Sequence, residues 1–382
     1  MKMRILQLGK FYPIRGGVEK VMWDLTRGLA DRGITCDMLC AKLPEDGIDP
    51  EDLPFHSEKD GVEVLRFPEG RTVWCVRAWA KKAATMLSPA MIQWLRRHRD
   101  EYDIVHVHHP DPMAALALRL SGFRGKVILH WHSDILSQRL LLAFYKPLQR
   151  WLIRRADVIV GTTPPYLAAS PYLRKVQAKC VAVPIGIDPV RFDPAMAEAF
   201  RNRFPGKRIV LSVGRLVPYK GFRYLIDALG RLPDNYHLVI GGTGPLHDEL
   251  AAQILFSGLD KRVSLIGFVP SGDLPSWFGA CDLFVLSSVM KTEAFGIVQI
   301  EAMSCGKPVV ATRIPESGVS WVNQEDVSGL NVSPCDPQAL ADAIQKVADD
   351  QARFGVGARR LFEERYTLDR MIDRISYIYQ SL

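Results

Sequence analysis

Residues 283–312, LFVLSSVMKTEAFGIVQIEAMSCGKPVVAT, contain the pattern of a strand, a turn, a helix and a second strand. The runs Leu283–Leu286 and Pro308–Ala311 are apolar on both faces, which is typical of parallel strands covered by helices on both sides. A helix is expected to start near Gly296, between the two strands. The residues expected to pack inward from it are Ile297, Ile300, Ala302 and Met303.

The same alternation of short Val- and Ile-rich runs with helical patterns extends along the whole chain. In the first half the predicted strands are Arg4–Leu8, Ile34–Cys40, Val62–Arg66, Ile104–His108, Val127–His130, Val158–Gly161 and Cys180–Val183. In the second half they are Ile209–Val213, His237–Ile240, Val263–Ile266, Leu283–Leu286, Pro308–Ala311 and Gly329–Val332. Two series of this kind predict two doubly wound α/β domains. The proline-rich stretch PIGIDPVRFDP, residues 184–194, is the expected linker.

The composition is that of a globular protein. The 382 residues are 48% apolar and 24% charged, which excludes a disordered chain, a collagen and a coiled coil. The longest uncharged stretch, Val158–Leu173, contains three prolines and is too short to span a bilayer. No secretory signal is recognisable, so we expect a cytoplasmic protein. The seven cysteines are scattered without zinc-ligand spacing, and we expect them to be reduced.

The basic residues are concentrated in one region. The net charge is +7, and residues 71–155 contain 15 basic and only 5 acidic side chains. Within this region, residues 71–99 combine three tryptophans with arginines and lysines, a composition typical of interfacial helices. We expect two helices separated at Pro89 that bind an anionic membrane surface peripherally; the alternative is an ordinary amphipathic pair. Nucleic acid is disfavoured as a partner because no recognition motif accompanies the charge.

Polar residues follow several predicted strands, at the edge where doubly wound sheets bind ligands. Gly16 and Gly17 precede an amphipathic helix, and their amides could face a phosphate, although a plain tight turn explains them equally well. They do not form the G-x-G-x-x-G fingerprint of dinucleotide-binding sites. In HWHSD, alternation places His130 and His132 on the same face, and His132 is the stronger candidate for a ligand contact. A metal at the histidines is disfavoured because no outlying ligand pattern accompanies them.

Three motifs in the second half predict an anion and sugar site. In GRLVPYKG, Arg215 and Lys220 follow a strand and can supply two cations to a diphosphate. Gly242 and Gly244 in GGTGP could face a phosphate, although a tight turn alone explains these glycines. Phe268 and Val269 in GFVP could offer backbone groups to a base. The last motif is EAFGIVQIE, where Glu293 lies just before a helix start and Glu301 lies inside the helix. Carboxylates at these places can accept hydrogen bonds from the vicinal hydroxyls of a sugar or ribose.

These motifs, taken together and in this order, resemble the retaining, nucleotide-sugar-dependent glycosyltransferases of family 4, which have the GT-B fold. The resemblance covers nearly the whole chain. It is carried by the GG turn at 16–17, HxH at 130–132, PIGID at 184–188, GRLVPYKG at 214–221, GGTGP at 241–245 and EAFGIVQIE at 293–301. It implies an acceptor-side domain over residues 1–186 and a donor domain over 187–365. The last segment, 366–382, is expected to cross back onto the first domain.

The resemblance also implies a role for each site residue. Arg215 and Lys220 would bind the donor diphosphate, with Gly17 near it from the other domain. Glu293 would bind the donor sugar, with the amides of Phe295, Gly296 and Ile297 nearby. Glu301 would bind the ribose, and His132 would contact the transferred sugar near its reacting carbon. No metal or other cofactor is expected, since no D-x-D motif is present.

The stretches TEAFGIVQIEAMSCGKPVV and SGVSWVNQEDVSGLNV look most like bacterial mannosyltransferases of surface-polysaccharide and lipopolysaccharide assembly that use GDP-mannose. The expected acceptor is a glycan or a lipid-linked glycan. Transfer from another GDP- or UDP-sugar is an alternative, as is a nucleotide-sugar epimerase on the same fold. A two-lobed binding protein would need export, for which the sequence shows no signal.

Overall fold

The computed structural model describes residues 3–14, 16–82, 85–135 and 139–382 and consists of two α/β units. The first unit contains Met1–Ile185 together with Leu368–Leu382, and the second contains Gly186–Thr367. The chain therefore leaves the first unit near the predicted linker and returns to it with its last helix.

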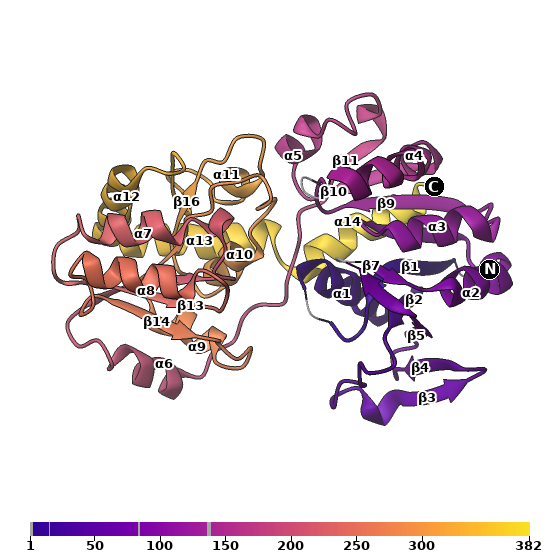
Figure 1. Cartoon of the computed structure of the whole chain (residues 1–382), viewed down its shortest axis with the longest axis horizontal. Coiled ribbons are helices and arrows are strands. Elements are labelled where there is room, and N and C mark those ends of the chain that lie inside the picture. The colour runs from indigo at the N-terminus through magenta and orange to yellow at the C-terminus, as the bar shows by residue number, and fades with distance from the viewer. Residues whose placement is uncertain (1–2, 15, 83–84, 136–138) are drawn as a thin grey trace. The chain divides into compact units, whose positions relative to one another are not determined.

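The first unit is built on a nine-stranded sheet in the order β11-β10-β9-β8-β1-β2-β5-β4-β3 (Figure 1). Its strands are β1 (Arg4–Phe11), β2 (Thr35–Lys42), β3 (His56–Lys59), β4 (Val62–Arg66), β5 (Thr72–Arg77), β8 (Ile104–His109), β9 (Lys126–Trp131), β10 (Val158–Gly161) and β11 (Cys180–Ala182). Neighbouring strands are parallel, except that β4 pairs antiparallel with both β3 and β5. Chain order reverses between β1 and β8, so the loops that follow these two strands diverge and leave room for a ligand.

The predicted helix pair over residues 71–99 is wrong. The segment before Pro89 forms β5 and then a small antiparallel hairpin of β6 (Ala80–Lys82) and β7 (Thr85–Leu87). Only α2 (Pro89–His98) is helical, and its Trp94 is buried rather than available to a membrane. In β5, Val73 and Cys75 are buried in the sheet. The alternating pattern, which predicts a strand, is therefore a better guide here than the aromatic and cationic composition, which suggested a helix.

The second unit is built on a six-stranded parallel sheet in the order β14-β13-β12-β15-β16-β17. Its strands are β12 (Arg208–Val213), β13 (Tyr236–Gly241), β14 (Val263–Gly267), β15 (Leu283–Leu286), β16 (Val309–Thr312) and β17 (Gly329–Val332). This is the strand order of a dinucleotide-binding fold, and its switch point lies between β12 and β15. The loops after these two strands contain GRLVPYKG and EAFG, so the topology brings the two motifs together.

Helices cover both sheets, as Figure 1 shows. In the first unit they are α1 (Gly17–Asp31), α2, α3 (Pro112–Ser121), α4 (Arg139–Arg155), α5 (Pro164–Ala169) and α14 (Leu368–Gln380). In the second they are α6 (Pro194–Arg201), α7 (Phe222–Leu229), α8 (His247–Phe256), α9 (Leu274–Ala280), α10 (Ile297–Ser304), α11 (Val319–Val322), α12 (Pro337–Asp349) and α13 (Gln351–Arg365). The core of the second unit is formed by strand residues such as Val210 and Leu238 packed against Leu225 and Ile344.

The last helix, α14, packs against α1 within the first unit (Figure 1). A Cβ atom on Gly28 of α1 would lie 2.8 Å from the side chain of Ile372, so a glycine is needed for this close approach. Arg32, just after α1, forms an ion pair of 2.7 Å with Asp369. On its inner side α14 buries Met371, Ile375 and Tyr379.

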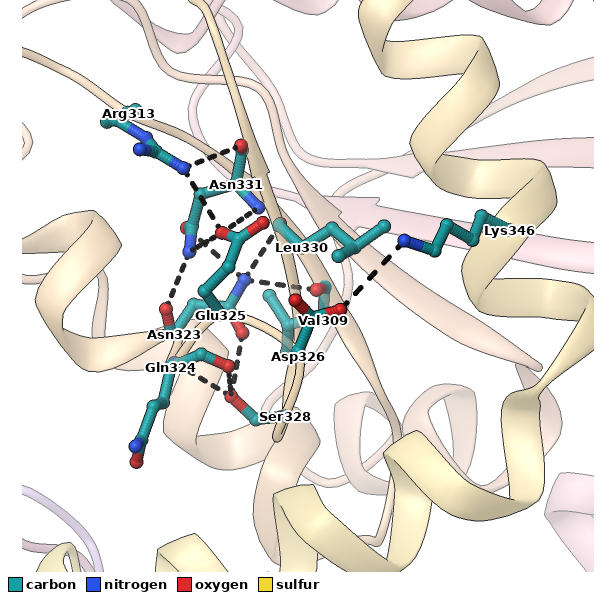
Figure 2. A network of polar contacts seen from close by, with 10 residues as sticks. All are labelled: Val309, Arg313, Asn323, Gln324, Glu325, Asp326, Ser328, Leu330, Asn331 and Lys346. Atoms are coloured by element: carbon teal, nitrogen blue, oxygen red, sulfur yellow. Dashed lines mark hydrogen bonds and ion pairs between the residues drawn. The ribbon is translucent and has the colours of Figure 1, made fainter.

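A polar network holds the loop before β17 (Figure 2). The amide nitrogen of the buried Asn323 donates to the carbonyl oxygens of Val309 and Leu330, at 3.1 and 3.0 Å. Ser328 donates to the side-chain oxygen of Asn323 at 2.8 Å, and Asn331 donates to its backbone oxygen at 2.7 Å. Because this loop precedes β17, it lies at the sheet edge opposite the ligand-binding loops, and we assign it a structural role.

We therefore expect Asn323→Ala to destabilise the protein without a direct effect on the site. Two buried carbonyl oxygens would each lose one hydrogen-bond donor, at a cost of roughly 2 kcal/mol in the free energy of unfolding. Chemical denaturation followed by fluorescence measures this loss. Asn202→Ala, at an exposed asparagine of the same unit, is the control and should change stability little. Equal stability of the two variants would contradict the role of the network.

Candidate active site

The loops after β12 and β15 are joined by backbone and side-chain hydrogen bonds. Ser287 donates through Oγ to the carbonyl oxygen of Lys220 at 2.9 Å, and the Val289 amide donates to Tyr219 at 2.8 Å. Gly221 has a φ of +67°, and a Cβ atom there would lie 2.2 Å from the carbonyl oxygen of Ser287. The two loops can approach this closely only with glycine at position 221.

This contact brings Lys220 and Glu293 together. Lys220 Nζ lies 2.5 Å from Glu293 Oε2, and Ser288 Oγ donates to the same oxygen at 3.0 Å. The two charged side chains are only 12% and 13% exposed. Glu293 Oε1 has no hydrogen-bond partner within the described part of the chain. One carboxylate oxygen therefore holds the lysine while the other can accept hydrogen bonds from a ligand.

Arg215 lies on the same loop as Lys220 but is exposed and forms no ion pair with any described residue. Since Glu293 balances the charge of Lys220, the guanidinium of Arg215 leaves the loop pair with a net positive charge. The structure thus joins two of the four predicted charged residues directly and leaves Arg215 available to an anion.

The helix after Glu293 begins as predicted. Gly296 adopts a left-handed conformation with φ +74° directly before α10, while Ile300, Ala302 and Met303 are buried. Ile297 is only partly buried, in contrast to the prediction, because it lies in the exposed first turn. Phe295 is buried and meets Tyr366 edge to face, which fixes the backbone at the helix start. Glu301 lies in the second turn of α10 and is half-buried.

The glycines of GGTGP allow the β12 and β13 loops to approach each other. A Cβ atom on Gly242 would lie 1.9 Å from the carbonyl oxygen of Gly214, and one on Gly244 would lie 2.5 Å from that of Leu216. The Leu216 amide in turn donates to Thr243 at 2.9 Å. Close loop packing alone therefore accounts for Gly242 and Gly244, and their contact with a phosphate stays a prediction.

The two residues after β14 that are predicted to bind a base differ in exposure. Phe268 is 74% exposed, whereas Val269 is half-buried, and a Cβ atom on Gly241 would lie 2.7 Å from the Val269 side chain. Val269 therefore supports the β13 loop. Recognition of a base by the backbone of Phe268 and Val269 remains a prediction.

In the first unit, Gly16 and Gly17 are exposed at the start of α1, as predicted. The carboxylate of Glu19 folds back and accepts hydrogen bonds from the backbone at Gly16 and at Glu19 itself. A Cβ atom on Gly16 would lie 2.4 Å from this carboxylate, which explains the glycine. Burial raises the pKa of Glu19, and Lys10 and Lys81 oppose this shift. An incoming phosphate at Gly17 would meet a helix start that its own carboxylate already caps.

Four histidines of β8 and β9 form a buried stack on one face of the sheet, and His132 is its outermost member. The ring centroids of His130 and His132 are 4.1 Å apart, and those of His108 and His132 are 5.2 Å apart. His132 is 6% exposed, and its Nε2 lies 2.9 Å from Nδ1 of His108. Trp131 points to the opposite face, where it stacks on His109, as alternation predicts. Burial lowers the pKa of His106, His108 and His132 well below the usual value.

The nitrogens of His106, His108 and His130 lie within 4.8 Å of one another, a spacing that could hold a metal ion. His108, however, uses both ring nitrogens in hydrogen bonds, to His132 and to Gln7. A metal at this trio would have to break one of these bonds.

The comparison with known proteins agrees with this architecture. Residues 197–364 match the family described as glycosyl transferases group 1, and residues 15–191 match glycosyltransferase family 4. The O-antigen chain mannosyltransferase C of Escherichia coli is 31% identical over 389 residues, which cover 100% of this chain and 99% of that protein. The chain belongs to the family 4 glycosyltransferases.

Other similar proteins are named for the transfer of other sugars or are known from solved structures. The D-rhamnosyltransferase WbpZ of Pseudomonas aeruginosa is 32% identical over 90% of the chain and 86% of that protein. Among solved structures, Anabaena HepE in complex with UDP superposes with a TM-score of 0.78 at 24% identity, covering 100% of both chains. Sucrose-phosphate synthase from Thermosynechococcus elongatus superposes with a TM-score of 0.75 at 22% identity over 99% and 98%. These likenesses show the GT-B fold. No helix within the described ranges of the glycosyltransferase is long and apolar enough to cross a bilayer.

Several residues around the site were missed from the sequence. Ser288 and Ser317 both support Glu293, the first at its carboxylate and the second by donating to its backbone oxygen. Gln7 is a fully buried amide in the apolar run ILQL, and Tyr379 on α14 donates or accepts hydrogen bonds with two partners. A glutamine in the middle of a buried strand is the one signal that could have been noticed.

The histidine stack makes the stability of the glycosyltransferase depend on pH. Burial lowers the pKa of His130 to about 3, and neither ring nitrogen has a hydrogen-bond partner among the described residues. In the unfolded chain this group titrates near pH 6.5, so its contribution is present above that pH and is lost as the pH falls toward 3. His130→Met removes this loss of unfolding free energy at low pH, because methionine does not titrate. Between pH 7 and 4.5 the variant should gain roughly 2.5 kcal/mol of unfolding free energy relative to the wild type.

Denaturant unfolding at both pH values measures this difference. The control is Leu129→Met at a buried neighbour in β9, which changes no titratable group, so its stability difference from the wild type should stay constant. A His130→Met difference that is also independent of pH would show that His130 titrates normally in the folded protein.

Proposed function

We propose that this glycosyltransferase moves mannose from GDP-mannose to a glycan or lipid-linked glycan in cell-surface polysaccharide synthesis, with retention at the anomeric carbon. The observation that carries the proposal is the Lys220–Glu293 ion pair, which lies at the switch point of the second sheet. In the proposal, its cation binds a phosphate and its carboxylate binds a sugar. The full-length similarity to an O-antigen mannosyltransferase supports the sugar and the pathway class.

The proposed donor site assigns one task to each group. Arg215 and Lys220 bind the diphosphate, and Gly17 of the first unit is assigned to the same group. The free Oε1 of Glu293 accepts hydrogen bonds from hydroxyl groups of the transferred sugar. Glu301 binds the ribose.

Backbone groups complete the proposed site. The amides of Phe295, Gly296 and Ile297 lie at the N-terminal end of α10, where the helix favours negative charge. His132 contacts the transferred sugar near its reacting carbon.

The proposed chemistry follows from where charge develops. The bond between the anomeric carbon and the leaving phosphate oxygen breaks, and a bond to the acceptor oxygen forms on the same face. The acceptor hydroxyl gives its proton to the leaving diphosphate. The transition state resembles an oxocarbenium ion, and negative charge grows on the diphosphate. Lys220, Arg215 and the α10 amides are preorganised to stabilise that charge, so we propose that no metal takes part.

A second donor class is favoured by specific relatives. The closely similar WbpZ is a D-rhamnosyltransferase, and the HepE structure holds UDP. A 6-deoxyhexose on GDP, or a hexose on UDP, is therefore the alternative donor for the same site.

Incubation of the protein with GDP-mannose, GDP-rhamnose, UDP-glucose and UDP-galactose, with and without lipid-linked glycan acceptors, tests the proposal. We expect release of GDP and a lengthened glycan from GDP-mannose only, with an α-linkage by NMR. Transfer from GDP-rhamnose or from a UDP-sugar would support the alternative donor. An epimerised nucleotide sugar without transfer would refute the transferase assignment. If a chelator abolishes the activity and a divalent ion restores it, the proposal that no metal takes part is refuted.

The ribose role of Glu301 is tested by calorimetry. Glu301→Ala should weaken GDP binding about tenfold or more, because the ribose hydroxyls lose a charged hydrogen-bond acceptor. Glu198→Ala, at an exposed glutamate of the same unit, is the control and should bind GDP normally. Unchanged GDP affinity in Glu301→Ala would refute the role.

We also propose that the β6–β7 hairpin, rather than a helix, binds an anionic membrane surface that carries the acceptor. Trp79 is 75% exposed and Leu87 is 44% exposed, and a backbone hydrogen bond of 2.8 Å pairs these two residues. Arg77, Lys81 and Lys82 are exposed next to them. An exposed indole among cations suits the interface of an anionic bilayer.

Flotation with vesicles of phosphatidylglycerol and phosphatidylcholine tests this surface. The protein should float with anionic vesicles only, and the double variant Trp79→Ala/Lys82→Ala should reduce the bound fraction severalfold. The matched control is Phe256→Ala/Lys261→Ala, which removes an exposed aromatic and a lysine from the second unit. Equal binding by the two double variants, or no dependence on anionic lipid, would refute the hairpin as the membrane contact.

A further inference from the structure

A continuous chain of buried hydrogen bonds joins the last helix to His132. Tyr379 OH on α14 lies 2.9 Å from Nε2 of Gln7 in β1, and Oε1 of Gln7 lies 2.8 Å from Nε2 of His108 in β8. Nδ1 of His108 then lies 2.9 Å from Nε2 of His132. All four residues belong to the first unit, and all four are buried.

The chemistry of each group sets the direction of the bonds. An amide oxygen can only accept, so Nε2 of His108 carries a hydrogen and donates to Gln7. A neutral imidazole has one protonated nitrogen, which leaves Nδ1 of His108 as an acceptor. Nε2 of His132 must therefore carry the hydrogen of that bond. What remains at His132 is a lone pair on Nδ1.

The surroundings keep the rings neutral. Burial and the neighbouring histidines lower the pKa of His108 and His132 well below the usual value, and burial raises the pKa of Tyr379 well above its usual value. Tyr379 accepts from Gln7, and its own proton points to Nδ1 of His106 at 2.7 Å.

The amide of Gln7 decides the polarity of the whole chain. If its oxygen and nitrogen were exchanged, every bond would reverse, and Nδ1 of His132 would carry a hydrogen instead of a lone pair. Nε2 of Gln7 donates to Tyr379 OH and lies 3.6 Å from Cys36 Sγ, so both contacts are made by the amide nitrogen. Its orientation in the structure is the one that leaves the lone pair on His132.

We propose that Gln7, His108 and Tyr379 are positioning residues that hold His132 as a neutral imidazole with its hydrogen on Nε2 and a free lone pair on Nδ1. This inference rests on the proposed function, in which His132 contacts the transferred sugar. A lone pair there accepts a hydrogen bond from a sugar hydroxyl next to the reacting carbon. A neutral ring also avoids repulsion of the positive charge that develops on that carbon in the transition state.

The tautomer can be observed without any substrate. In the full chain labelled with ¹⁵N-histidine, two-dimensional NMR of the ring nitrogens distinguishes protonated from bare nitrogens, and loss of a signal in His132→Gln assigns His132. We expect a single form with a bare Nδ1. Tyr379→Phe and Gln7→Met should replace it with a mixture of both tautomers. A His132 protonated on Nδ1 in the wild type, or an unchanged tautomer in both variants, would overturn the proposal.

Kinetics provide the second measurement. Tyr379→Phe should lower kcat about tenfold, with KM for the donor changed by less than about twofold, since ring orientation is used mainly in the transition state. Tyr102→Phe is the matched control: its buried hydroxyl donates to Asp37 at 2.8 Å on the same sheet but does not reach His132. Equal kcat values for the two variants would contradict the proposal. If the wild type transfers no sugar from any donor, the proposed function fails, while the NMR measurement still decides the tautomer.

Discussion

Replacing Lys220 with alanine will lower the turnover of glycosyl transfer by about a hundredfold or more, equivalent to about 2.7 kcal/mol of transition-state stabilisation. The ammonium is nearly buried beside Glu293, where water screens its field poorly. In the proposed donor site, its charge would therefore act strongly on the diphosphate as the sugar leaves. Steady-state kinetics with the donor identified by the panel measure the loss.

The control is Lys261→Ala, which removes an exposed lysine from the opposite edge of the same sheet and should leave turnover unchanged. Thermal unfolding of Lys220→Ala should show that the domain remains folded, since Ser288 still binds Glu293. Near-normal turnover in a folded Lys220→Ala would remove Lys220 from the mechanism.

Gly221→Ala will cost roughly 4 kcal/mol of stability and most of the activity, although it adds only a methyl group. The left-handed φ of +67° costs an alanine about 1–2 kcal/mol. The new Cβ would also lie 2.2 Å from the carbonyl oxygen of Ser287, so the two loops must separate, at a further cost of about 1–3 kcal/mol. Separation moves Lys220 away from Glu293, and turnover should fall with stability.

Gly206 offers a matched comparison, because its φ is +71° and nothing lies within 4 Å of a Cβ built there. Gly206→Ala should lose only the conformational term, about 1 kcal/mol, and keep full activity. Denaturant unfolding and turnover of the two variants separate backbone strain from loop contact. Equal losses at both positions would show that the contact with Ser287 does not matter.

The parallel strands were predictable because they are buried on both faces. Runs such as Leu283–Leu286 and Val158–Gly161 have no polar face, and this pattern has few other structural meanings. The helix start near Gly296 was also predicted, because apolar residues recur with helical spacing directly after it. The number and order of the strand–helix repeats predicted two domains, with the boundary between them near residue 186.

The region from β3 to β7 was not predictable in the same way. Its strands are short and lie at the sheet edge or in a separate hairpin, so much of their surface is polar. Lys81 and Lys82 on β6 are exposed, and composition then resembles that of an amphipathic helix. Tertiary pairing with β2, rather than local preference, makes β5 a strand.

The site was predictable in its residue types but not in its contacts. Glu293 and Lys220 were identified by motif, but their direct ion pair depends on the strand order that makes β12 and β15 neighbours. For the glycines of GGTGP the sequence left a phosphate contact and a tight turn open, and the structure adds their part in loop packing. The partners of His132 come from β1, β8 and α14, and no sequence spacing relates Gln7 to Tyr379.

The placement of α14 has a consequence for the order in which the protein folds during synthesis. Residues 186–367 form a self-contained unit, and all of them are translated before α14. The first unit, although it is made first, lacks until then the helix that covers Gly28 and supplies Tyr379. The N-terminal half therefore leaves α1 and β1 incompletely covered until α14 has emerged from the ribosome and packed against α1.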